Sequence, residues 1–144
     1  FMSGTASRVP AALRHNLEHN KVLHERVLFV TVKTQPVPHV PEADRLEIED
    51  FGGGIHRVKI LYGFMDEPDV PAALRLAAGA LDIGDPNDAT YFLGRETIIA
   101  SGRPGMARWR ERLFALMSRN ATPATAFFGI PPDRVVELGE QIEI

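Results

Sequence analysis

Residues 91–120 constrain the fold most, because here a strand pattern runs directly into a helix pattern. The segment YFLGRETII is rich in strand-forming residues, although Gly94-Arg95-Glu96 interrupts it, so it predicts either one strand or two. Ser101-Gly102-Arg103-Pro104 then predicts a turn. After the turn, five apolar residues recur at the spacing of one helix face, which we expect to pack in the core: Met106, Trp109, Leu113, Leu116 and Met117.

A triple glycine at residues 52–54 separates two segments that alternate apolar and polar residues, 46–50 and 55–62. Alternation of this kind is typical of half-exposed strands, and the glycines allow the positive φ angles of a tight turn. The triple glycine lacks the G-x-G-x-x-G spacing of a phosphate-binding loop. We therefore predict a β-hairpin.

The other segments complete an α/β pattern. Residues 27–34 begin with a nearly continuous apolar run, which predicts a strand in a central, buried position. Asp69 is a suitable N-cap for a helix over 70–81, with Pro71 in its first turn. Further predicted elements are a helix over 9–17, a proline-rich loop over 35–41, a short helix over 122–129 and strand-like segments over 134–139 and 141–144.

Together these elements predict one α/β (α+β) domain over residues 9–144, in which about three helices pack on a mixed sheet that contains the hairpin. Residues 1–8 are expected to be a flexible segment. The opening Phe1-Met2-Ser3-Gly4 does not resemble a natural start, so we expect the chain to be a piece of a longer protein.

Composition excludes several kinds of site and partner. Apolar residues make up 44% of the 144 residues, an ordinary value for a globular protein. The net charge is −3, so the chain lacks the excess of basic residues that is typical of nucleic-acid-binding proteins. The chain has no cysteine, which excludes disulfides, thiolate zinc sites and cysteine nucleophiles. No apolar run approaches the roughly 18–20 residues that span a bilayer.

Residues 15–25 hold the densest group of histidines and acids. A helix would place His15 and His19 on one face, where Glu18 or His24 could complete a metal site. The H-E-x-x-H arrangement is missing, however, and the favoured interpretation is a polar segment that hydrogen-bonds nearby backbone. We therefore predict no metal ion and no other cofactor.

No catalytic signature is present. The chain lacks a G-x-S-x-G nucleophile elbow, and nothing in its 19 acidic residues singles out a pair suited to glycoside hydrolysis. We therefore do not expect an enzyme.

Arginines surround the turn between the predicted strand and helix of residues 91–120. The free N–H groups at a helix start favour anions, and an aromatic side chain there, Trp109 or Tyr91, could stack on a base. The alternatives are surface ion pairs of small energy, contacts with a partner subunit, or an internal Arg95–Glu96 pair. The candidate ligand or partner residues are Arg95, Arg103, Trp109, Arg110 and Arg112.

These motifs together resemble the C-terminal cytosolic domain of the KUP/HAK/KT family of potassium uptake transporters. The resemblance extends over essentially the whole chain, in order. It rests on HNLEHNKVLHERVLFVTV (15–32), YGFMDEPDVPAAL (62–74), YFLGRET (91–97), RPGMARWRERLFALMSRNA (103–121) and FFGIPPDRVVELGEQIEI (127–144).

The resemblance implies a parent protein that spans the cytoplasmic membrane and takes up potassium, with protons as the expected coupling ion. The ion pathway would lie outside this chain, which would be a regulatory or assembly domain on the cytoplasmic side. Its expected partners are the transmembrane part of the same transporter and a second copy in a homodimer. Cyclic di-AMP is a candidate nucleotide regulator, but no residue motif for its site maps onto this sequence.

Overall fold

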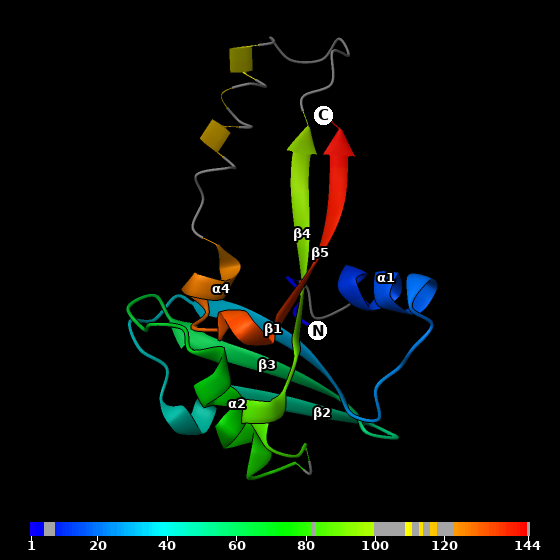
Figure 1. The fold of residues 1–144 in the computed structure, drawn as a ribbon. Coiled ribbons are helices and arrows are strands. Elements are labelled where there is room, and N and C mark those ends of the chain that lie inside the picture. The colour runs from blue at the N-terminus through cyan, green and yellow to red at the C-terminus, as the bar shows by residue number, and fades with distance from the viewer. Residues whose placement is uncertain are drawn as a thin grey trace.

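A computed structural model describes residues 1–4, 8–81, 83–99, 109–110, 113, 116–117 and 123–143, with only the backbone at 96–99 and 140–143. The predicted α/β class is confirmed (Figure 1). Among the described residues no helix is long and apolar enough to cross a membrane. The elements are α1 (Ala11–His19), β1 (Val27–Gln35), β2 (Leu46–Gly52), β3 (Ile55–Gly63), α2 (Val70–Ala78), β4 (Tyr91–Ile99), α4 (Ala124–Phe127) and β5 (Val135–Glu143), with 3-10 turns at Glu42–Asp44, Pro86–Asp88 and Pro132–Arg134.

The first sheet has the strand order β1-β3-β2, with β1 parallel and β2 antiparallel to β3. The predicted central position of residues 27–34 is therefore wrong, because β3 lies in the middle. Residues 1–3 follow the other edge of β1, where Ser3 N donates to Val30 O (2.8 Å) and Val30 N donates to Phe1 O (3.0 Å). Since β1 is hydrogen-bonded along both edges, its apolar sequence does not require that it be the middle strand of the sheet.

The predicted hairpin is confirmed by the pairing of β2 with β3, in which Ile48 lies opposite Val58. Gly52, Gly53 and Gly54 all have positive φ angles, as expected for the turn. Gly54 has a second constraint, because a Cβ there would overlap the carbonyl oxygen of Glu25. The turn is thereby fixed against the segment that leads into β1.

The second sheet is a parallel pair of strands, β4 and β5, in which Tyr91 lies opposite Val135 and Arg95 opposite Gly139. β4 is one continuous strand, so Gly94 and its neighbours do not divide it. Met2 N donates to Phe92 O (2.9 Å), which connects this sheet through residues 1–3 to β1. Figure 1 shows the pair rising from the rest of the domain with α1 beside it, and α1 contacts both strands.

The core forms where α2 packs on the three-stranded sheet. As predicted, Asp69 caps α2, since its Oδ1 accepts from Ala72 N (2.8 Å). Tyr91 and Leu93 bring the start of β4 into the same core. The buried cluster consists of Val30, Val58, Ile60, Tyr62, Val70, Ala73, Leu74, Tyr91, Leu93 and Ile130.

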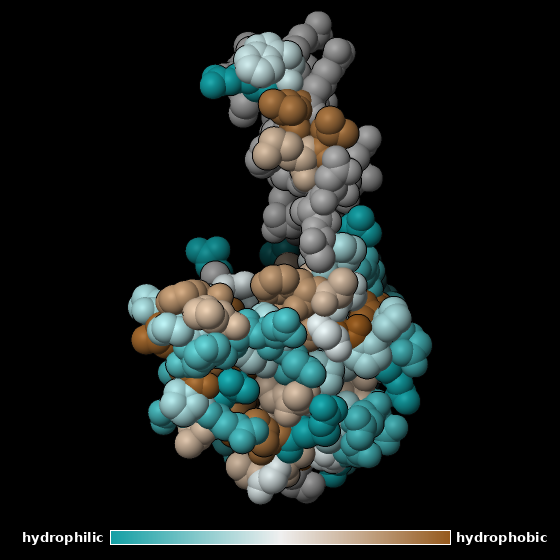
Figure 2. Space-filling model, turned by 90° about the vertical axis from the view of Figure 1, so that its left-hand side faces the viewer, coloured by the Kyte–Doolittle hydropathy of each residue, from teal (hydrophilic) through white to brown (hydrophobic). Residues whose placement is uncertain are grey.

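The predicted apolar helix face after Pro104 does not belong to this core. Trp109, Leu113, Leu116 and Met117 have helical backbone, but their exposed fractions are 66%, 47%, 55% and 63%; Met106 lies outside the described residues. Figure 2 shows brown, apolar atoms in this projecting segment, away from the body of the domain. The expectation of burial was wrong because helical spacing decides which residues share a face and leaves open what covers it.

Candidate functional site

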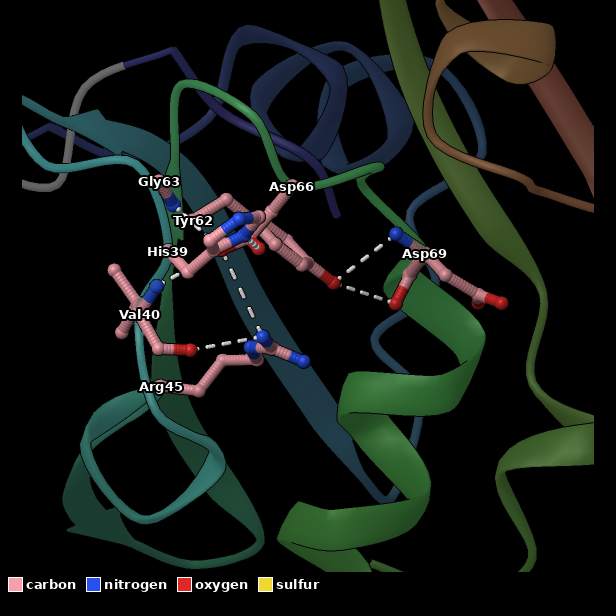
Figure 3. A network of polar contacts seen from close by, with 7 residues as sticks. All are labelled: His39, Val40, Arg45, Tyr62, Gly63, Asp66 and Asp69. Carbon is pink, nitrogen blue, oxygen red and sulfur yellow. Dashed lines mark hydrogen bonds and ion pairs between the residues drawn. The ribbon is translucent and has the colours of Figure 1, made fainter.

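The carboxylate of Asp66 joins the loop after β1 to the turn after β3 (Figure 3). Its Oδ2 accepts hydrogen bonds from Gly63 N (2.8 Å) and Val40 N (3.0 Å), and its Oδ1 lies 2.7 Å from Nδ1 of His39. Arg45 donates to the carbonyl of Val40 (2.9 Å), with Nη2 3.7 Å from the carboxylate. One carboxylate thus holds two segments that are 26 residues apart in the sequence.

These contacts fix the charge state of Asp66. The hydrogen bond from Val40 N, then those from His39 and Gly63 N, hold the pKa of the Asp66 carboxyl well below its usual range. A general acid or base works best when its pKa lies near the operating pH. The arrangement therefore suits a structural clamp and does not suit proton transfer.

The predicted ligand residue Arg95 forms an ion pair across the second sheet, with Nη1 3.2 Å from Oε2 of Glu137. The alternative ion pair of Arg95 with Glu96 concerns a side chain outside the described residues.

 The exposed Arg95 side chain lines a cavity of about 380 Å³ between α1 and the β4–β5 pair, together with Arg8 and His15.

The other predicted ligand residues lie in the projecting segment or outside the described residues. Trp109 and Arg110 are both exposed, with the Arg110 guanidinium 5.8 Å from the centre of the Trp109 ring. Within the part of the chain that the structure describes, neither residue contacts Arg95, so the predicted group is not brought together there. Arg103 and Arg112 lie outside the described residues.

The histidine-rich segment forms the last turn of α1 and the loop after it. His15, Glu18 and His19 share one face, and one potential ligand atom from each lies within 4.8 Å of the others. The ring of His24 instead lies 5.6 Å from the ring of Phe92. Of the two residues that the sequence offered to complete a metal site, the structure therefore places Glu18, and not His24, beside the histidine pair.

A cavity that the sequence analysis did not predict lies between residues 1–2, β1 and the start of β4. It measures about 380 Å³, and its lining includes His24, Arg26 and Phe92, with the ring of Phe1 stacked on Phe92 at 4.5 Å. The start of β4 is more than 60 residues away in the sequence from the residues of β1 that line the cavity. No local motif could have revealed it, because only the tertiary fold brings these segments together.

Comparison with known proteins identifies the family. The family described as "K+ potassium transporter C-terminal domain" matches residues 1–144. Proteins named "Probable potassium transport system protein Kup" from Xanthomonas campestris pv. campestris (strain 8004) and Azoarcus sp. (strain BH72) are 53% and 52% identical over 145 and 144 residues. "Probable potassium transport system protein Kup 1" from Novosphingobium aromaticivorans is 50% identical over 147 residues.

Each match covers 100% of this chain but only 22–23% of the relative, so the chain spans less than a quarter of the length of these proteins. No solved structure matches the chain. The family match covers every motif on which the resemblance to potassium uptake transporters rested. The chain belongs to the potassium transporter C-terminal domain family.

Proposed function

We propose that this chain is a cytosolic regulatory and assembly domain of a proton-coupled potassium uptake transporter of the cytoplasmic membrane. The family match over residues 1–144 carries the proposal, together with relatives that are named as potassium transport proteins and are more than four times as long as the match. The longest described helices have nine residues, whereas a membrane span needs about 20. We therefore assign the ion pathway to the part of the transporter outside this chain.

The exposed apolar face of Trp109, Leu113, Leu116 and Met117 supports an assembly role. Exposed apolar groups of this kind commonly mark surfaces that another protein covers. A two-fold dimer would bring the same face of two copies together and remove both from water. We assign this face to a homodimer contact, in which each domain also remains attached to its own membrane part.

Light scattering coupled to size-exclusion chromatography tests the dimer. We expect the average mass to rise from monomer to dimer as concentration increases, and Met117→Asp to shift the equilibrium toward monomer. Met65→Asp is the matched control, because Met65 and Met117 are both 63% exposed, and Met65 belongs to the turn after β3, where its N–H donates to Pro38 O. A strict monomer at high concentration, or equal effects of the two substitutions, would contradict the assignment.

Nucleotide sensing is a second candidate function, favoured by the exposed pairing of Arg110 with Trp109. The indole offers a surface for a base, and the guanidinium offers a partner for phosphate. Calorimetry with cyclic di-AMP, AMP and ATP tests this role, and we expect Trp109→Ala to abolish the heat of binding. Phe51→Ala is a suitable control, because Arg57 lies over the Phe51 ring in the same way at 4.7 Å. Absence of heat with all three nucleotides, well above micromolar concentration, would count against sensing of these ligands.

A further inference from the structure

We propose that the last turn of α1 binds a divalent transition-metal ion of the zinc class through His15, Glu18 and His19. The spacings of three and four residues place the three side chains on one helix face. One ligand atom from each lies within 4.8 Å of the others. The inference rests on this local geometry and is independent of the proposed role in assembly.

Hydrogen bonds of the buried Asn16 hold the helix turn that carries the three side chains. Asn16 is buried, with 3% of its surface exposed, and its Nδ2 donates to the carbonyl of Val22 (2.9 Å). Asn20 bonds to Asn16 twice, through its backbone N to Asn16 O (2.9 Å) and through its Nδ2 to Asn16 Oδ1 (2.8 Å). The helix end therefore resists fraying, which lowers the entropy that metal binding must overcome.

To reach coordination geometry, the side chains must move closer together and the histidine rings must turn toward a common point, because an imidazole nitrogen binds a metal in the plane of its ring. The imidazole rings of His15 and His19 are nearly parallel, with 10° between their planes and 5.9 Å between their centres. Bonds of 2.0–2.1 Å to a tetrahedral zinc ion would place the ligand atoms about 3.4 Å apart. Glu18 and His19 are exposed and can rotate toward half-buried His15, which sets the position of the site.

Two imidazoles and one carboxylate select a class of metal. Nitrogen donors suit Zn²⁺, Ni²⁺, Co²⁺ and Cu²⁺, whereas Mg²⁺ and Ca²⁺ prefer sites built from oxygen. Three protein ligands leave at least one coordination position open for water or for a group from another part of the transporter. Because α1 packs on β4 and β5, an ion bound here would stabilise the folded state of the helix that borders the second sheet.

Metal titration of the untagged chain tests the site. By calorimetry we expect one Zn²⁺ per chain, and with Co²⁺ we expect visible absorption bands that Zn²⁺ displaces. His19→Ala and Glu18→Gln should each weaken binding at least about tenfold, since loss even of an outer-shell partner typically costs 10–100-fold. Both side chains are exposed, so these substitutions should leave the fold intact, as circular dichroism can verify.

His24→Ala and Glu25→Gln are the matched controls, because they remove the same chemical groups from the same exposed segment but lie outside the trio. We expect both to bind Zn²⁺ like the unmodified chain. The proposal would be overturned by an absence of Zn²⁺ and Co²⁺ binding at millimolar concentration. It would equally be overturned if His19→Ala and Glu18→Gln bound as tightly as the controls.

Discussion

The hydroxyl of Tyr62 is hydrogen-bonded to both backbone groups of Asp69, donating to its carbonyl (2.7 Å) and accepting from its N–H (3.0 Å). Asp69 is the residue that caps α2, so this contact fixes the start of the helix to the end of β3. Tyr91, in the same buried cluster, differs: its hydroxyl is buried and has no hydrogen-bond partner among the described residues. The two tyrosines are therefore matched in burial and opposite in hydrogen bonding.

Replacing each tyrosine with phenylalanine should affect stability differently. Tyr62→Phe leaves two backbone groups without their partner and should lower the free energy of unfolding by about 1–3 kcal/mol. Tyr91→Phe removes an unsatisfied buried hydroxyl and should be neutral or slightly stabilising. Urea unfolding followed by circular dichroism measures both. Equal destabilisation by the two substitutions would show that the Tyr91 hydroxyl has a partner.

The clamp at Asp66 predicts how stability depends on pH. The folded-state pKa of Asp66 is depressed below the value of about 3.9 that is usual for an unfolded aspartate. The ionised carboxylate therefore contributes stability above about pH 4, and this contribution is lost as the pH falls toward the folded-state pKa. Asp66→Asn should lower stability at pH 7 and flatten the decline below pH 4.

Urea unfolding at several pH values between 3 and 7 makes this comparison. Asp50→Asn provides a control, because Asp50 is an exposed carboxylate whose contacts, with Gly52 N (2.8 Å) and with Nδ1 of His56 (3.1 Å), stay within one hairpin. An Asp66→Asn variant that loses as much stability below pH 4 as the unmodified chain would contradict the assignment of the clamp.

Substitution of two glycines in the hairpin turn distinguishes the effect of backbone strain from the effect of a steric overlap. Gly53 and Gly54 have φ angles of 62° and 79°, so alanine is strained at both. Nothing lies within 4 Å of a Cβ at Gly53, whereas a Cβ at Gly54 would overlap the carbonyl oxygen of Glu25. Gly54→Ala should therefore lower the melting temperature clearly more than Gly53→Ala. Equal shifts would mean that the contact with Glu25 is readily relieved.

Local patterns predicted most elements of the fold. The alternation around residues 52–54 gave the hairpin, and Asp69 with Pro71 marked the start of α2, because these signals depend on residues close together in the sequence. The predicted central position of β1 was wrong, because an apolar run indicates that a strand is buried but does not indicate which strands pair with it. The prediction that Trp109 and Met117 are buried was wrong for a similar reason. Periodicity shows which residues share a helix face, but it does not show which surface covers that face.

The candidate sites were predictable only in part. His15 and His19 were paired correctly from their spacing, because a helix fixes that relationship locally. The choice of Glu18 over His24 required the structure, since the chain turns away after Asn20. The Asp66 clamp was missed because its partners at residues 39, 40 and 45 approach it only through the packing of a proline-rich loop against β3.

The proposed function can be tested by measuring the potassium uptake rate of the full-length transporter with and without this domain. The rate would be measured in cells that lack other potassium uptake systems and divided by the amount of transporter in the membrane. A regulatory and assembly domain predicts a rate that falls on truncation but stays above that of cells without the transporter. An unchanged rate, or complete loss at normal membrane abundance, would contradict the claim that this domain controls an ion pathway located elsewhere.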